Sequence, residues 1–193
     1  MYKTVNKCWQ VEAQTTRSSF GIYQASLAVY EKGGKVILIS GSSDKKIKVW
    51  DLDSYNVITT LEGHGGGIIP LTVYTDDERQ YLASGGNARE IKIWRLDDFS
   101  LVKTINADNL IFALVGLDID EKKILASGNN EGKIQLWNLN DNACMKTIQA
   151  HSDTIWTLCA VQCDGEVCLT SGILYIKINI CKICQSSEEE AFQ

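Results

Sequence analysis

The stretch Ile39–Leu52 reads ISGSSDKKIKVWDL, and close copies of it return twice farther along the chain. Leu82–Leu96 reads LASGGNAREIKIWRL, and Leu125–Leu139 reads LASGNNEGKIQLWNL. Each copy holds a short apolar segment that ends in Ser-Gly, then a polar turn, then an alternating segment that ends at Trp. The serine and the tryptophan are ten residues apart every time: Ser40 and Trp50, Ser84 and Trp94, Ser127 and Trp137.

A leucine lies thirteen residues before each of these serines. The leucines are Leu27, Leu71 and Leu114. A fourth copy keeps this interval with Leu158 and Ser171, but Cys181 stands where the tryptophan is expected. Identical spacing at two independent offsets indicates a structural unit of about 43 residues that is repeated along the chain.

Within each copy, apolar and polar residues alternate with a period of two, which is typical of β-strands. In the second copy the pattern predicts strands at Ile68–Tyr74, Gln80–Ser84, Glu90–Trp94 and Leu101–Ile105. The connections are rich in Gly, Asn and Asp, which favour tight turns. No segment keeps a 3.6-residue period over three turns. We therefore expect an all-β chain.

The outermost predicted strands resemble one another: Val57–Leu61 (VITTL), Val102–Ile105 (VKTI) and Met145–Ile148 (MKTI). The segment Tyr2–Val5 (YKTV) fits the same series. Gln185–Gln193 (QSSEEEAFQ) does not, and its like charges favour a solvated tail. We therefore expect the fourth unit to lack its outer strand and the N-terminal segment to provide a spare one, an arrangement that would seal a closed ring.

A four-stranded antiparallel unit of this length, with Trp at the end of its third strand, is typical of a propeller blade. The chain resembles the WD40-repeat (β-propeller) family over nearly its whole length, through its Ser-Gly pairs, Asp44, Trp50-Asp51, Gly63-His64 and Ala150-His151. The resemblance implies a single WD40-type domain over residues 1–193, with four antiparallel blades in a partial or small propeller and a degenerate last blade. The implied units cover approximately residues 20–61, 63–105, 107–148 and 150–184, with an N-terminal strand plus loop at 1–19 and an acidic tail at 185–193.

Most propellers of this family have seven blades, so four units make about half of one. The chain is then expected to be a fragment of a larger ring, an open arc completed by another chain, or a strained four-bladed ring. An open arc exposes strand edges that invite pairing. The expected partners are therefore other proteins or peptides, together with self-association to complete the propeller.

The resemblance implies that each blade is held by a hydrogen-bonded chain of His, Ser, a turn Asp and Trp. An unpaired member of such a chain costs about 1–3 kcal/mol where water has little access. No unit has the full set. The residues at these positions are Phe20, Ser40, Asp44 and Trp50 in the first unit, His64, Ser84, Ala88 and Trp94 in the second, Asp108, Ser127, Glu131 and Trp137 in the third, and His151, Ser171, Tyr175 and Cys181 in the fourth. We expect Trp50, Trp94 and Trp137 to lie in the core.

The resemblance also implies a partner-binding face at the narrower opening of the central channel. The positions that map to it are Tyr23, Ala25, Ser43, Ile69, Asn87, Phe112, Asn130 and Trp156. An aromatic patch surrounded by small polar residues has the composition of an interface hot spot. The alternative is that Trp156 and Phe112 only fill the channel of a small ring.

Composition argues against several other functions. A formal net charge of -5 and a pI near 5.1 do not fit a nucleic-acid partner. The first residues lack the apolar core of a secretory signal, and no apolar run approaches the roughly 20 residues that span a bilayer. We therefore expect a cytoplasmic or nuclear protein with no membrane partner.

No cofactor and no metal are expected. Among the seven cysteines, Cys181 and Cys184 have the spacing of half a zinc site, but a complete site needs a second ligand pair. The two histidines, His64 and His151, already have positions in the repeat. A zinc-dependent or redox module around the two cysteines stays as an alternative.

A hydrolase would need a serine, a base, an orienting acid and an oxyanion hole around one open site. His64 with Ser84, and His151 with Ser171, lie in different units and have structural roles in the repeat instead. The chain is therefore expected to be a non-enzymatic scaffold or adaptor for protein–protein interaction. The alternative is a substrate-recognition subunit of a ubiquitin ligase, although the Trp-Asp-x-Arg signature of one such class is absent after Trp50 and after Trp94.

Overall fold

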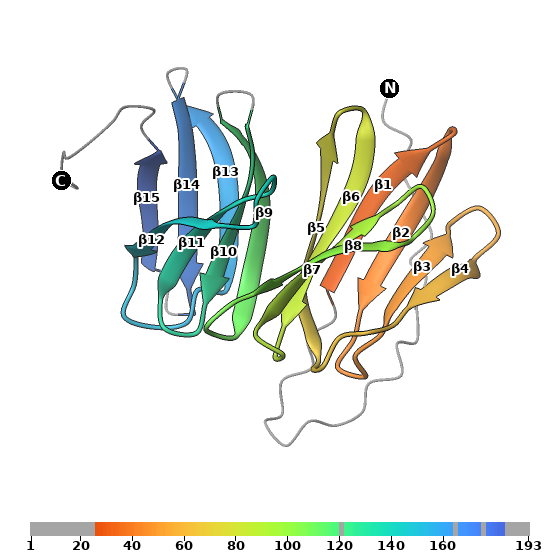
Figure 1. Cartoon of the computed structure of the whole chain (residues 1–193), viewed down its shortest axis with the longest axis horizontal. Helices are drawn as coiled ribbons and strands as arrows, with labels where there is room; N and C mark the ends of the chain where they lie inside the picture. Colours follow the sequence, from red (N-terminus) through yellow and green to blue (C-terminus); the bar gives the residue numbers. More distant parts are fainter. Residues whose placement is uncertain (1–25, 120–121, 164–165, 175–176, 184–193) are drawn as a thin grey trace.

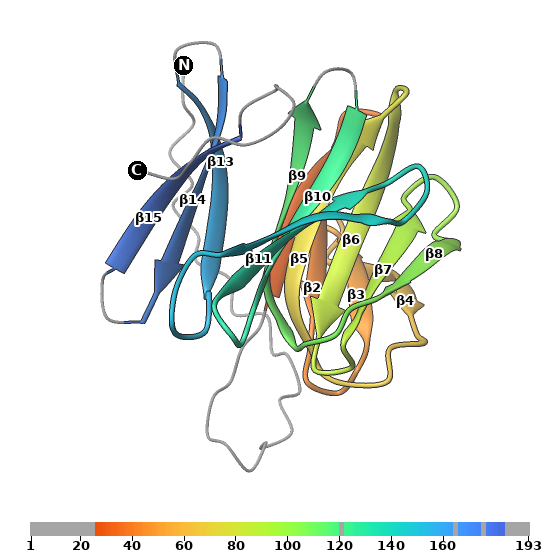
Figure 2. The ribbon, with the colours of Figure 1, turned by 60° about the vertical axis from the view of Figure 1, so that its left-hand side comes forward.

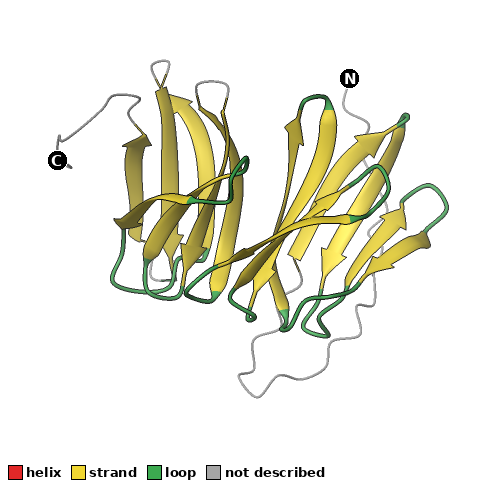
Figure 3. Cartoon of the chain, viewed as in Figure 1, coloured by secondary structure: helices red, strands yellow, loops and turns green. Residues whose placement is uncertain are grey.

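The computed structural model describes residues 26–119, 122–163, 166–174 and 177–183. Every regular element in these ranges is a β-strand, and the strands form separate antiparallel sheets (Figure 1, Figure 3). None of the described residues belongs to a helix long and apolar enough to cross a membrane. The prediction of an all-β fold built from four antiparallel units is confirmed.

Each sheet is a meander in which neighbouring strands follow the chain order. Unit 1 contains β1 (Ser26–Lys32), β2 (Lys35–Gly41), β3 (Ile47–Asp51) and β4 (Asn56–Leu61). Unit 2 contains β5 (Ile68–Asp76), β6 (Arg79–Gly86), β7 (Glu90–Arg95) and β8 (Leu101–Asn106). Unit 3 contains β9 (Ile111–Ile119), β10 (Lys122–Asn129), β11 (Lys133–Asn138) and β12 (Cys144–Gln149). Unit 4 contains β13 (Thr157–Cys163), β14 (Glu166–Ile173) and β15 (Lys177–Ile183).

The predicted strands of the second unit lie inside β5 to β8, which extend them by one or two residues at some ends. Unit 4 has three strands among the described residues. The predicted tail at 185–193 and the predicted spare strand Tyr2–Val5 both lie outside them. Pro70 is accommodated in β5 because the pairing of β5 with β6 shifts between Ile68 and Leu71. Such an irregularity frees the position that a proline cannot use in a ladder.

The sheets stack face to face in a curved row from unit 1 to unit 4 (Figure 1, Figure 2). The first strands β1, β5, β9 and β13 lie next to one another in that order along the inner side of the row. Unit 1 and unit 4 occupy the two ends of the row in Figure 1. The four units therefore form an open arc.

The two faces of each sheet carry different residues, because side chains alternate along a strand. We call the face with the repeated serine and tryptophan the Trp face; in unit 2 it carries Leu82, Ser84 and Trp94. The opposite face, which we call the Ile face, carries Ile39, Ile47 and Val49 in unit 1, Ala83, Ile91 and Ile93 in unit 2, and Ala126, Ile134 and Leu136 in unit 3.

The core lies between units, in three joints of one kind. At the first joint, Ile39 and Val49 on the Ile face of unit 1 pack in one cluster with Leu82 and Trp94 on the Trp face of unit 2. Equivalent residues form the joints between units 2 and 3 and between units 3 and 4. A single sheet cannot bury its own apolar faces, so each unit depends on its neighbours for stability.

The glycine of the Ser-Gly pair in each of units 1 to 3 sits at a joint. A Cβ atom on Gly41 would lie 2.6 Å from Ile68 Cγ2 of the next unit. The same atom on Gly85 would lie 3.0 Å from Ile111, and on Gly128 it would lie 2.6 Å from Ile155. Real Cβ contacts are longer, so these positions admit no side chain unless the joint shifts. The repeated glycine is thus explained by close packing between units.

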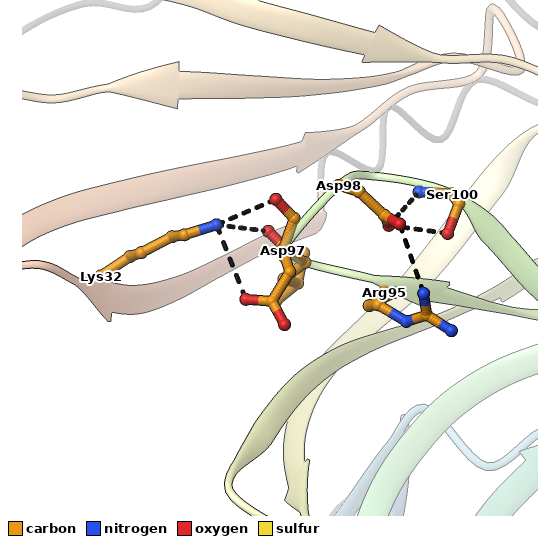
Figure 4. A network of polar contacts seen from close by, with 6 residues as sticks. Lys32, Arg95, Asp97, Asp98 and Ser100 are labelled. Carbon is orange, nitrogen blue, oxygen red and sulfur yellow. Dashed lines mark hydrogen bonds and ion pairs between the residues drawn. The ribbon is translucent and has the colours of Figure 1, made fainter.

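Polar contacts also join units 1 and 2 (Figure 4). The ammonium of Lys32, at the end of β1, donates to the carbonyl oxygens of Leu96 and Asp97 at 3.2 and 3.1 Å. It also lies 3.6 Å from the Asp97 carboxylate. In unit 2, Lys103 donates in the same way to the carbonyl oxygen of Leu139 in unit 3. Each lysine satisfies carbonyl groups in the turn between the third and fourth strands of the next unit.

Candidate functional site

Unit 2 contains a continuous chain of buried polar side chains. Trp94 Nε1 donates to Ser84 Oγ at 2.9 Å, and Ser84 Oγ lies 2.7 Å from His64 Nε2. On the other side of the ring, His64 Nδ1 lies 3.2 Å from a carboxylate oxygen of Glu90. The imidazole tautomer with its proton on Nδ1 satisfies all of these groups, because it donates to Glu90 and accepts from the serine hydroxyl.

The carboxylate of this chain comes from Glu90, not from the turn position where the sequence has Ala88. The prediction that unit 2 has an incomplete set is therefore wrong. Glu90 also accepts from the Gly65 amide at 3.0 Å and pairs with Lys92 at 3.3 Å. The longer glutamate side chain reaches the histidine from the first residue of β7, two positions beyond Ala88.

The surroundings shift the pKa values of both His64 and Glu90. Burial, the largest effect, lowers the pKa of His64; the nearby Lys92 ammonium lowers it further, and Glu90 opposes both. Burial by itself raises the pKa of Glu90, but the Gly65 amide, Lys92 and His64 together hold it below its ordinary value. The ion pair and the neutral imidazole therefore form a stable structural network.

The other units hold partial chains. Trp50 donates to Ser40 and Trp137 donates to Ser127, each at 2.9 Å. His151 Nε2 lies 2.8 Å from Ser171 Oγ, and its Nδ1 is buried without a partner among the described residues. Phe20, Tyr175 and the Cys181 side chain lie outside the described part of the chain.

Three predicted members take other positions. Asp44 accepts from the amide of Lys46 within its own turn, and Glu131 pairs with Lys133 at 2.7 Å on the surface. In unit 3 the histidine position is occupied by the buried Ala107, and the exposed Asp108 lies beside it.

The two serines that contact a histidine, Ser84 and Ser171, cannot act as nucleophiles on a substrate from solution. Ser84 and Ser171 are 0% and 1% exposed. Nucleophilic catalysis needs the attacking oxygen to face an open site. The buried polar chains therefore serve the fold, as the sequence predicts.

A depression of about 260 Å³ opens where the four first strands converge on the inner side of the row. We call it the first-strand depression. Phe112 and Trp156 meet in it edge to face, with ring centroids 4.9 Å apart and ring planes at 70°. Its lining residues are Ser26, Ile69, Pro70, Leu71, Phe112, Ala113, Leu114, Trp156, Thr157 and Leu158. The structure thus brings together three predicted site residues, Ile69, Phe112 and Trp156.

The predicted turn residues Ser43, Asn87 and Asn130 do not line the first-strand depression. Asn87 donates its amide to the Gly67 carbonyl at 2.9 Å, and Asn130 Oδ1 accepts from the Leu110 amide at 3.2 Å. These contacts hold the turn between the second and third strands against the loop before the first strand. Tyr23 and Ala25 lie outside the described residues.

Sequence reasoning missed the leucines and the proline of the depression. Leu71, Leu114 and Leu158 line it together with Pro70. The signal was present, since these leucines are the ones that recur thirteen residues before each serine. In the sequence their spacing marks the repeat and does not show that they share a surface.

A metal site finds no support in the described part of the chain, where no group of three or more His, Cys, Asp and Glu residues could hold an ion. Cys184 and the side chain of Cys181 lie outside that part.

Comparison with known proteins identifies the repeat. A family model described as "WD domain, G-beta repeat" matches residues 20–51 and 55–95, the stretches that hold β1 to β3 and β4 to β7. The chain therefore contains WD40 repeats within residues 20–95. Among curated protein sequences, none matches this WD40 chain.

Solved structures share the fold of this WD40 chain. The crystal structure of the computationally designed Ika4 protein is similar with a TM-score of 0.67 and 20% identity, over 90% of this chain and 94% of that one. The computationally designed Ika8 protein is similar with a TM-score of 0.64 and 21% identity, over 84% of this chain and 46% of that one. The WD40 chain thus spans about half the length of Ika8. At these identities the likeness is one of fold alone.

Proposed function

We propose that this WD40 chain is a non-enzymatic scaffold that binds a peptide or a protein segment in the first-strand depression. WD40 repeats generally mediate protein–protein interactions. The observation that carries the proposal is the pair of Phe112 and Trp156, which is only partly buried and faces an open depression.

The chemistry of the depression suits a protein segment that offers an apolar side chain together with polar backbone groups. Its volume of about 260 Å³ is below the roughly 300–1,000 Å³ that is usual for small-molecule sites. Eight of its ten lining residues are aliphatic or aromatic, although the surface that they turn to the depression is more polar than apolar. Tryptophan is enriched among the residues that dominate binding energy at interfaces. A Leu, Ile or Phe side chain, inserted from a bound segment, would cover the aromatic pair and displace water from it.

The rigidity of the site supports the same function. Ala113 and Leu114, which line the depression, are also part of the joints between units, so the depression is fixed by the core. A preformed apolar surface loses little conformational entropy when a ligand binds.

Selection of peptides from a displayed library on the 193-residue chain would test the proposal. We expect ligands with a central apolar residue, and we expect Trp156→Ala to weaken their binding by about tenfold to a hundredfold, which corresponds to the loss of one aromatic anchor. Val102→Ala is the matched control, because Val102 is exposed on β8, away from the depression.

The thermal unfolding midpoint of each variant separates binding from folding. Lost binding at an unchanged midpoint supports the proposal. A large drop in the midpoint of Trp156→Ala, or peptides that bind this variant as well as the parent, would mean that Trp156 serves only to fill the channel.

A further inference from the structure

The three joints pair a Trp face with an Ile face, so an open row of four units leaves one face of each kind uncovered at its ends. The uncovered Trp face belongs to unit 1, and the uncovered Ile face belongs to unit 4. We propose that a second copy of this chain covers both, head to tail, so that two rows close into one ring of eight units. This proposal concerns the end faces and is independent of binding in the first-strand depression.

The Trp face of unit 1 is exposed where its counterparts are covered. Leu27 is 60% exposed, whereas Leu114 at the same position of unit 3 is 8% exposed. Val29 is 54% exposed on the same face. Trp50 is only partly buried, although the sequence predicted it in the core, while Trp94 and Trp137 are buried. The difference arises because no described unit packs against the Trp face of unit 1.

The Ile face of unit 4 shows the same contrast. Ile180 is 68% exposed. Its counterparts Val49, Ile93 and Leu136 are 0%, 1% and 4% exposed. Val161 on β13 is 38% exposed, and Leu117 at the equivalent position of unit 3 is 6% exposed. An apolar β-sheet face left in water is unfavourable in proportion to its area.

The internal joints show which surface fits each end. On the Ile face of unit 1, the position of Ile180 is held by Val49, which packs in one cluster with Leu71, Leu82 and Trp94 of the next unit. The residues at the same positions of unit 1 are Leu27, Leu38 and Trp50. The Trp face of unit 1 therefore carries the apolar residues that would cover the Ile face of unit 4.

A second copy satisfies both ends at once. Each copy offers one Trp face and one Ile face, so two copies related by a twofold axis leave no end uncovered. A bound peptide would cover only a strip of either sheet. The match of this row to about half the length of Ika8 is compatible with as much chain again in a row of this fold.

Sedimentation of the 193-residue chain over a range of concentrations tests the proposal. We expect a species of twice the 21.4 kDa chain mass. Leu27→Glu places a charge on the Trp face of the proposed joint between copies, and Ile180→Glu places one on its Ile face. Each is therefore expected to raise the dimer dissociation constant at least about a hundredfold. Both side chains are largely exposed within one chain, so the fold of the single copy should be retained.

A mixture of the two variants identifies the head-to-tail arrangement. The Ile face of the Leu27→Glu chain and the Trp face of the Ile180→Glu chain are both intact, so the mixture should regain a dimer with one good joint. If the dimer instead joined the unit 1 faces of two copies, Ile180→Glu would not weaken it, and mixing the two variants would not restore dimerisation of the Leu27→Glu chain.

The control is Leu101→Glu, because Leu101 is 46% exposed on β8 in an inner unit and should not change the mass. Trp156→Ala should not change it either, which separates this proposal from binding in the first-strand depression. A monomer at every concentration would overturn the proposal and would leave residues 1–25 or an unrelated protein to cover the ends. Continued growth into larger assemblies would overturn the closed ring.

Discussion

Ser84 is the residue on which the polar chain of unit 2 converges. Its hydroxyl oxygen accepts from Trp94, contacts His64, and lies 3.3 Å from the carbonyl oxygen of Lys92. Ser127 has the same place in unit 3, but Ala107 stands where unit 2 has its histidine, so Ser127 contacts Trp137 and no imidazole. The two serines are therefore a natural pair for comparison.

Replacing Ser84 with Ala should destabilise the chain by about 2–4 kcal/mol, because two buried groups, on Trp94 and His64, lose their partner. Ser127→Ala leaves only the Trp137 indole without its partner and should lower the free energy of unfolding by about 1–2 kcal/mol. Urea unfolding followed by tryptophan fluorescence measures both. Equal losses would show that the histidine contact contributes nothing.

The pKa of His64 makes stability depend on pH. Its folded pKa is below the ordinary 6.5, so the unfolded chain binds a proton first as the pH falls. The contribution of neutral His64 is therefore complete above about pH 6.5 and is lost as the pH falls through the lower folded pKa. Glu90 ionises at lower pH than its ordinary value and so stays charged in this range.

We expect the urea midpoint of the parent chain to fall between pH 7.5 and pH 5.5, and to fall less in His64→Gln, which has no imidazole at this position. Both proteins are measured in one buffer series. Parallel pH profiles would contradict the assignment of the effect to His64.

Sequence could indicate the polar chain of unit 2 but not its carboxylate. Ala88 occupies the expected turn position, and Glu90 substitutes for it because a longer side chain from the start of β7 points back to His64. In unit 3, counting from Ser127 leads to Ala107, one residue before the acidic Asp108. Such substitutions depend on side-chain reach in three dimensions, which linear spacing does not contain.

At the scale of strands and sheets, the sequence was more informative. The period of two gave the strands of unit 2 to within about two residues, because one face of each strand must be apolar at every joint. It did not reveal which turn residues would be held by backbone hydrogen bonds. Asn87 and Asn130, which the sequence predicts at the binding face, also form hydrogen bonds that hold their turns.

The joint glycines give a prediction for whole sheets. Gly85→Ala should destabilise the chain by about 1–3 kcal/mol, because the new methyl group would meet Ile111 inside the joint between units 2 and 3. Gly172→Ala, measured in dilute protein where the Ile face of unit 4 has no neighbour, is the control, since its methyl group would meet only the methyl of Thr157, an exposed side chain that can rotate away. Thermal unfolding of both variants measures the difference, and equal midpoints would contradict a role of the glycine in the joint.

At the scale of the molecule, stability should vary along the row. Inner units are covered on both faces, whereas unit 4 is covered on one and has three described strands. In a row of repeats each unit gains from its neighbours only, so the end units open first.

Hydrogen exchange in dilute protein should therefore be faster in β14 than in β6, by about a hundredfold or more. Both strands pair on both edges, so the comparison isolates the covering of the sheet face. Equal protection of β14 and β6 would show that the row unfolds as one cooperative body.

The contact of a Ser-Gly glycine with the isoleucine at or just before the start of the next sheet has a consequence for how such a chain can change over generations. Because every seam uses this same contact, a duplicated cassette of about 43 residues would find a fitting neighbour wherever it were inserted. Gene duplication could thus lengthen the molecule without compensating changes elsewhere, and the number of cassettes, not the identity of any one of them, would decide whether its ends meet.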